Sequence, residues 1–297
     1  MQPNRGLAES KPPAINPYAV LVLAVITCSF GSLFARLAEA PPIIVAFYRI
    51  GLTTVILGPV AWVTCRKEIL GLNPRELLIA AASGLFLALH FYTWITSLYF
   101  TTVASSTVLV STHPLFVVAG SYLFLKEKVS AQALIGSILA IGGCVIIGLG
   151  DFALGGKAFL GDMLAVAGAG FVAAYFVIGR GLRRKLSLLS YVVVVYSTCS
   201  LVLLFIALTT NAPLYPYPPE TWALFLALAV VPTIGGHTLF NWVLGHLPAP
   251  VVSVSILGEP VVASILAVLF LAESPTLQQA AGGAIIIIGM LRFFLSK

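Results

Sequence analysis

Residues 92–114, YTWITSLYFTTVASSTVLVSTHP, align without a gap with residues 238–260, TLFNWVLGHLPAPVVSVSILGEP. Proline meets proline at the end of both stretches. The same register pairs further residues: Phe124 with Phe270, Glu127 with Glu273, Gln132 with Gln278, Gly136 with Gly282 and Gly143 with Gly289. A chance match would not hold proline, glutamate and glycine in one ungapped frame, so the chain contains an internal repeat.

The composition around this repeat excludes a soluble globular protein. Hydrophobic residues make up 60% of the 297 residues, and charged residues only 9%, against about 25% in soluble domains. The mean hydropathy of +1.06 leaves no room for a separate aqueous domain, because each membrane span needs about 20 residues. The net charge of +6 does not indicate nucleic-acid binding, because the basic residues lie in short clusters between apolar segments.

Ten apolar runs are long enough to cross a bilayer, so we expect an all-α membrane protein with ten transmembrane helices. A polar tail, residues 1–17, precedes them and is expected in the cytoplasm. The runs lie near residues 18–38, 42–64, 76–96, 101–125, 131–150, 160–180, 188–209, 221–243, 248–271 and 276–295.

Lys and Arg are distributed unequally between the two sides of this arrangement. Of the 16 basic residues, all but Arg36, Arg49 and Lys157 fall on the side that holds both termini. Positively charged loops remain in the cytoplasm. We therefore expect a multi-pass protein of the cell inner (plasma) membrane with both termini cytoplasmic.

The repeat divides the spans into two halves, residues 18–150 and residues 160–297. Each half is expected to hold five helices, an odd number, so the second half must enter the membrane from the opposite side. Such inverted repeats are typical of secondary transporters, whose substrate site lies between the halves near the bilayer midplane.

The sequence resembles the EamA-type branch of the drug/metabolite transporter (DMT) superfamily. The similar features are ten spans in two halves, Arg49 within AFYRIGL, and the equivalent segments HPLFVVAGSYLFLKE (residues 113–127) and EPVVASILAVLFLAE (residues 259–273). The resemblance implies transport of amino acids, nucleosides, sugars or other metabolites. It also favours kinked, continuous helices over broken ones at three prolines, Pro114, Pro232 and Pro260.

Two charged residues lie within expected spans. Arg49 is interpreted either as the cation for a substrate carboxylate or as a structural arginine that bonds helix carbonyls. Glu259 is the only acid well inside a span, where hydrocarbon favours the neutral, protonated form. It is interpreted either as a proton carrier or as a structural acid that is hydrogen-bonded beside a kinked helix.

Other polar and aromatic residues extend this candidate site. His113 occupies the repeat position of Glu259, and Ser255 precedes Glu259 by one helical turn. His90 and Trp94 share a helix face through their spacing of four residues. His237 and Asn241 have the same spacing. The predicted substrate-binding residues are Arg49, His90, Trp94, His113, His237, Asn241 and Glu259, with proton coupling assigned to Glu259.

From these features we expect a secondary active transporter that moves a small organic metabolite, an amino acid or related zwitterion, by alternating access. One alternative is an exporter of nucleosides, sugars or other drugs. Another is a membrane enzyme, although the chain has no HExxH motif, CxxC pair or P-loop. No cofactor or metal is expected. The expected partners are the substrate and the lipid bilayer, and the expected state is a monomer or weak dimer.

Overall fold

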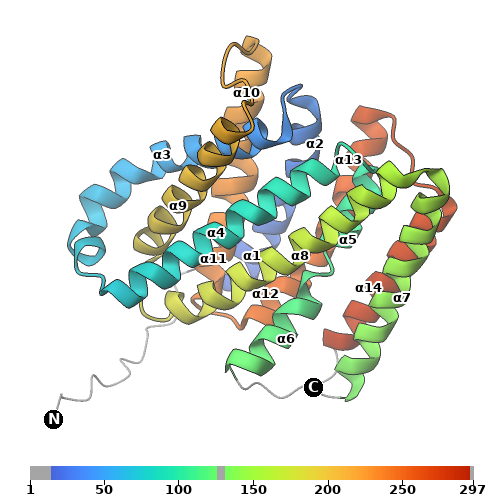
Figure 1. Ribbon diagram of the computed structural model, residues 1–297. Coiled ribbons are helices and arrows are strands. Elements are labelled where there is room, and N and C mark those ends of the chain that lie inside the picture. Colours follow the sequence, from blue (N-terminus) through green and yellow to red (C-terminus); the bar gives the residue numbers. More distant parts are fainter. Residues whose placement is uncertain (1–14, 126–130, 295–297) are drawn as a thin grey trace.

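The computed structural model describes residues 15–125 and 131–294 (Figure 1), in which every regular element is a helix. The all-helical prediction is thereby confirmed. The first half contains α1 (Pro17–Cys28), α2 (Phe30–Leu37), α3 (Pro42–Leu70), α4 (Pro74–Ser97), α5 (Val103–Val110), α6 (His113–Leu125) and α7 (Ala131–Leu154). The second contains α8 (Gly156–Arg183), α9 (Leu188–Thr209), α10 (Pro219–Leu228), the π-helix η1 (Ala229–Thr238), α11 (Leu239–Leu244), α12 (Ala249–Ser255), the 3₁₀ turn η2 (Ile256–Gly258), α13 (Glu259–Leu271) and α14 (Leu277–Phe294).

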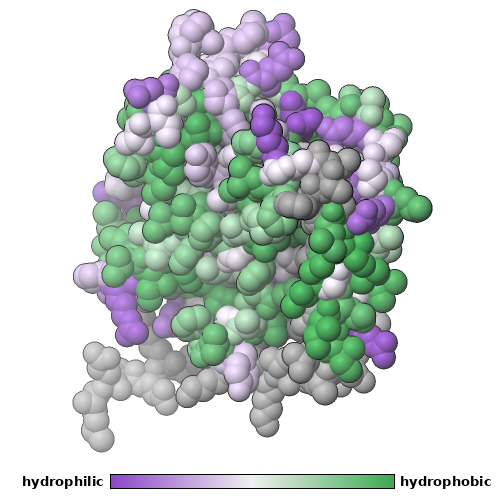
Figure 2. Space-filling view, turned by 45° about the vertical axis from the view of Figure 1, so that its right-hand side comes forward, coloured by the Kyte–Doolittle hydropathy of each residue, from purple (hydrophilic) through white to green (hydrophobic). Residues whose placement is uncertain are grey.

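Among the described residues, eight helical stretches are long and apolar enough to cross a membrane. They are Pro17–Leu37, Pro42–Leu70, Pro74–Ser97, Val103–Phe124, Gly156–Arg183, Leu188–Thr209, Pro219–Leu244 and Ala249–Leu271. The helices α7 and α14 carry shorter apolar stretches, Ile138–Ile147 and Leu277–Gly289. Figure 2 shows a broad apolar surface, with hydrophilic residues gathered toward its upper and lower edges. The chain is thus a multi-pass membrane protein, while ten spans remains a prediction.

Local sequence signals set the starts of the spans. Pro17, Pro42, Pro74 and Pro219 stand at the first turn of their helices, where a missing N–H breaks no helical bond. The side chain of Asn73 accepts a hydrogen bond from the Glu76 backbone N–H at 2.8 Å. Such caps accept hydrogen bonds from the first backbone N–H groups of a helix, which have no partner within the helix.

In two spans the α-helical hydrogen-bond pattern changes just before a proline that the repeat places in register. Pro114 has no N–H for the carbonyl of Val110, one helical turn earlier, and this carbonyl instead contacts Nδ1 of His113 at 3.2 Å. At Pro260, the equivalent carbonyl accepts the backbone N–H of Glu259. His113 and Glu259 therefore lie where the helical hydrogen-bond pattern changes, while each span, Val103–Phe124 and Ala249–Leu271, remains one helical stretch.

A third proline lies within the π-helix η1. Pro232 frees the carbonyl of Leu228, which accepts the hydroxyl of Thr233 at 2.7 Å. The Thr233 oxygen in turn accepts from Nε of Arg49 at 2.9 Å. The π-helix thus fixes the position of the arginine in the neighbouring span, consistent with the functional association of such distortions.

The helices α7 and α14 form a closely packed pair at the edge of the molecule (Figure 1). A Cβ atom at Gly143 would lie 2.6 Å from the carbonyl oxygen of Gly282. A Cβ atom at Gly289 would lie 2.7 Å from the carbonyl oxygen of Gly136. Only glycine permits this approach, so these glycines serve helix packing.

The predicted orientation has a direct test in reporter fusions. Reporters joined after residues 70 and 184 are expected to read cytoplasmic, because basic clusters lie there. Reporters after residues 155 and 215 are expected to read on the opposite side. Paired phosphatase and fluorescent-protein fusions measure each location. A cytoplasmic reading at residue 215 would contradict both the charge argument and the inverted repeat.

Candidate functional site

A small cavity of about 30 Å³ lies between the two halves of the chain. It brings together five of the seven predicted site residues: His90, Trp94, His113, His237 and Glu259. They come from α4, α6, η1 and α13, so residues far apart in the sequence converge on one place. The volume holds roughly two water molecules at about 10–15 Å³ each, so a metabolite requires the cavity to open.

Arg49 is fully buried behind this cavity, at 0% exposure. Its Cζ lies 4.3 Å from the centroid of the Phe91 ring and 5.8 Å from that of Trp94. Nε is bonded to Thr233, whereas Nη1 and Nη2 make no hydrogen bond to a nitrogen or oxygen atom of the described residues. The Cys28 thiol lies close to the guanidinium. A buried guanidinium with two unused nitrogens is costly unless an anion satisfies it. Arg49 therefore combines a structural contact with an unfilled capacity to bind a carboxylate.

Glu259 begins α13 and contributes its half-buried side chain to the cavity wall. Arg49 is close enough for its charge to act on this carboxyl group, but the two form no ion pair in the part of the chain that the structure describes. The carboxyl group makes no hydrogen bond to the described residues, and both interpretations of Glu259 stay predictions. It faces the cavity and has room to meet a ligand or water.

Three histidines surround the cavity with different partners. His90 bonds the carbonyl of Gly168 through Nδ1 at 2.9 Å and stacks on Trp94 at 5.9 Å. The ring of His237 lies 6.3 Å from that of His90, and its Nδ1 has no hydrogen-bond partner among the described residues. Nε2 of His113 is likewise unpartnered among them. The histidines therefore offer polar ring atoms next to the cavity.

Asn241 lies behind the cavity wall rather than in it. Its Nδ2 donates to the carbonyl of His237 at 2.8 Å and to the hydroxyl of Tyr175. These bonds fix the turn of helix that carries His237. Ser255 also lies away from the cavity, beside Val25 and Ile26 of α1, because the 3₁₀ turn η2 rotates it away from the face of Glu259.

Several lining residues carried no clear signal in the sequence. Cys28 lines the cavity with Ser111, Phe176 and Phe240. Phe176 and Phe240 are apolar residues within apolar spans, and such residues look alike whether they face a cavity or lipid. Ser111 lies two residues before His113. Pro114, which changes the helix geometry at this point, was the only feature of the sequence that pointed to Ser111 as a lining residue.

The described residues contain no group of three or more His, Cys, Asp or Glu side chains placed to hold a metal ion. The histidine rings pack mainly on aromatic neighbours. The site geometry is that of hydrogen-bond donors and acceptors around a small apolar-walled cavity. It suits recognition of an organic molecule.

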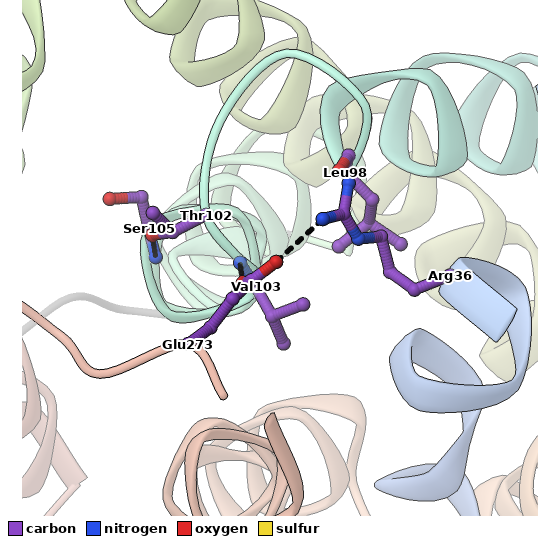
Figure 3. A network of polar contacts seen from close by, with 6 residues as sticks. All are labelled: Arg36, Leu98, Thr102, Val103, Ser105 and Glu273. Carbon is purple, nitrogen blue, oxygen red and sulfur yellow. Dashed lines mark hydrogen bonds and ion pairs between the residues drawn. The ribbon is translucent and has the colours of Figure 1, made fainter. Parts of the chain in front are cut away.

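A polar network closes one end of the helix bundle (Figure 3). Arg36 contacts Oε1 of Glu273 through Nη2 at 2.6 Å and donates from Nη1 to the carbonyl of Leu98 at 2.6 Å. Oε2 of Glu273 accepts the backbone N–H of Val103 at 3.0 Å. The network joins α2, the turn between α4 and α5, and the segment after α13. We refer to Arg36, Glu273, Leu98 and Val103 as the Arg36–Glu273 network.

Arginines also bind backbone carbonyls at the opposite end. Arg180 donates to the carbonyl of Leu244 at 2.7 Å, and Arg183 donates to that of Asn241 at 3.0 Å. Leu98 and Leu244 are equivalent in the repeat register. Each end of the bundle is therefore tied by an arginine bound to the same repeat position.

Comparisons with known proteins agree with these features. The EamA-like transporter family matches residues 16–149 and again residues 159–295. An "Uncharacterized transporter" of Archaeoglobus fulgidus is 26% identical over 201 residues, and the match covers 62% of this chain and 65% of that protein. The chain thus spans slightly less than two thirds of that relative. A solved structure described as "Crystal structure of protein" has a TM-score of 0.67 at 19% identity, over 93% of this chain and 95% of that chain, a likeness that shows the fold alone.

Proposed function

The chain belongs to the EamA-like transporter family of the drug/metabolite transporter superfamily, and from this premise we propose that it moves a small carboxylate-bearing metabolite, an amino acid or related zwitterion, by alternating access. Membership of a transporter family favours transport over the alternative of a membrane enzyme.

The observation that carries the substrate class is the unused pair of nitrogens on Arg49. A carboxylate presents two oxygens in the geometry of the guanidinium fork, so both Nη groups can be satisfied at once. Nucleosides and sugars offer hydroxyl and carbonyl groups without a matching charge. The buried position of Arg49 strengthens this preference, because an uncompensated charge is most costly away from water.

A second residue of the site, Glu259, can recognise a second charge on the substrate. Glu259 faces the cavity without a hydrogen bond to the described residues, and its carboxylate form can accept an ammonium group. Trp94, Phe176 and Phe240 add aromatic surface to the cavity wall. A buried cation and an acid at one site match the two charges of a zwitterion.

Alternating access is supported by the size of the cavity and by contacts that relate the halves. The cavity is too small for a metabolite, and arginine bonds tie both ends of the bundle. The glycine contacts between α7 and α14 are reciprocal in the repeat register, since Gly143 meets Gly282 as Gly289 meets Gly136. This pattern is expected of two halves related by a pseudo-two-fold axis. Releasing one end at a time would expose the site to alternate sides.

The Arg36–Glu273 network is expected to hold the outer end closed. Replacing Glu273 with Gln removes the ion pair but retains an oxygen for the Val103 N–H. A partly exposed pair contributes about 1 kcal/mol, so the open population should rise about fivefold. Cys28, which lines the cavity, reports this opening as faster labelling by a membrane-impermeant thiol reagent added outside.

The measurement requires a background in which Cys65, Cys144 and Cys199 are replaced. Glu220→Gln is the matched control, because Glu220 is an exposed acid at the start of α10 outside the network. Equal labelling of Cys28 in the Glu273 variant and in this background would count against the network as a closure.

The function itself is tested by transport into liposomes containing the purified chain. We expect saturable uptake and counterflow of amino acids, with a matched decarboxylated amine as a poor substrate. A thermal-shift screen over metabolites identifies candidates first, since ligands that bind only the folded state raise its melting temperature. Counterflow of nucleosides or sugars without any carboxylate substrate would overturn the substrate proposal. Chemical conversion without counterflow would indicate an enzyme.

A further inference from the structure

A second, larger hollow lies on the side of the bundle, between α4, α6 and α8. Its volume is about 960 Å³, at the upper end of the range of about 300–1,000 Å³ for ligand sites. In Figure 1, α4 and α8 run side by side, and α6 leaves them toward the lower edge of the molecule. We call this hollow the α4–α8 groove.

The groove is separate from the central cavity. Val172 and Phe176 of α8 line the cavity, whereas Gly170, Ala174 and Gly181 line the groove. Spacings of four and seven residues place Gly170, Ala174 and Gly181 along one stripe of the helix, away from the cavity-facing stripe. Helix α8 therefore stands between the two spaces.

Small residues make the floor of the groove, and aromatic side chains make its walls. A Cβ atom at Gly170 or Gly181 would meet no atom within 4 Å, so these glycines border open space rather than a packed helix. Phe86 and Phe116 stand on α4 and α6. The α4–α8 groove is therefore an apolar groove along a membrane-spanning helix, and its shape and polarity fit hydrocarbon chains.

Two basic side chains lie at one end of the α4–α8 groove. Arg75 lies at the first turn of α4, and Lys185 follows the end of α8. Both are exposed, and no acidic residue contributes to the described lining. This end also carries Arg66, Lys67 and Arg184, together with the acids Glu68 and Glu76 outside the groove lining, so it lies at a membrane surface and keeps a net positive charge.

From this juxtaposition we propose that the α4–α8 groove binds one anionic phospholipid, with its acyl chains along α8 and its headgroup at Arg75 and Lys185. Charge complementarity selects an anionic headgroup over a zwitterionic one. Basic pockets between transmembrane helices bind such headgroups at the cytoplasmic surface. The site is independent of the transported substrate, because α8 separates it from the cavity.

Native mass spectrometry of the delipidated, full-length chain tests this assignment. Phosphatidylglycerol and phosphatidylcholine with identical acyl chains are the probes. We expect the first phosphatidylglycerol to bind about 30-fold more tightly than phosphatidylcholine, from about 1 kcal/mol per basic residue. The double variant Arg75→Gln/Lys185→Gln should bring the two affinities together. Equal affinities in the wild type would overturn the proposal.

The acyl-chain part of the site is tested by filling the groove. Gly170→Leu places a side chain in open space and is expected to weaken binding of the first phosphatidylglycerol several-fold without unfolding. Gly58→Leu is the matched control, since a Cβ there also meets no atom within 4 Å, and Lys67→Gln is the control for charge. Unchanged lipid affinity in a folded Gly170→Leu variant would overturn the proposal. Loss of substrate uptake with unchanged lipid affinity would instead make the groove a substrate passage.

Discussion

Replacing Arg49 with Lys is expected to weaken binding of a carboxylate substrate at least about tenfold, because an ammonium group can replace only one of two charge-assisted hydrogen bonds that are worth about 1.5–3 kcal/mol each. Lysine keeps the positive charge but not the planar fork that offers Nη1 and Nη2 together. Neither nitrogen makes a hydrogen bond to a nitrogen or oxygen atom of the described residues, so both remain available to the substrate. Substrate-dependent thermal stabilisation and counterflow measure the loss.

A structural effect of this change is distinguished by its controls. Arg49 also holds Thr233 through Nε, so the variant's own melting temperature is measured without substrate. Arg66→Lys is the matched control. Arg66 is exposed, lies over the ring of Trp62 and does not line the cavity. The decarboxylated analogue should bind the Arg49→Lys variant and the wild type equally. Unchanged carboxylate affinity in the folded variant would reject the proposed role of Arg49.

Replacing Glu259 with Gln is expected to abolish substrate accumulation driven by a pH gradient. Exchange should continue at saturating substrate, with a lower substrate affinity because the carboxylate that accepts the ammonium group is lost. Glutamine keeps the size and hydrogen-bonding oxygen of the side chain but releases no proton. Exchange requires no net proton movement, whereas accumulation against a gradient does. Uptake into liposomes with and without an imposed pH difference separates the two processes.

Other titratable groups lie near Glu259 and could carry the proton in its place. His90, His113 and His237 line the same cavity and are the remaining titratable candidates. The charge of Arg49 also acts on the Glu259 carboxyl group. Glu76→Gln is the control for removing an acid outside the cavity. Wild-type pH-driven accumulation in a normally expressed Glu259 variant would exclude it as the proton carrier. Loss of the folded protein would support a structural role instead.

The sequence by itself determined the class of the protein. Apolar runs of membrane-spanning length require helices, because only internal hydrogen bonds satisfy a backbone in lipid. The repeat register paired His113 with Glu259, and the depth of Arg49 and Glu259 marked them as unusual. These inferences rest on local composition and spacing, which do not depend on how the helices pack.

Only the tertiary structure decided which polar residues meet. It placed His90, His113, His237 and Glu259 on one cavity but left Asn241 behind its wall. It also joined Arg36 to Glu273. Periodicity alone could not separate the faces of these helices, because a span in lipid is apolar toward both the bilayer and its packed neighbours. The contacts depend on local changes of helix geometry at prolines and on close packing between distant segments.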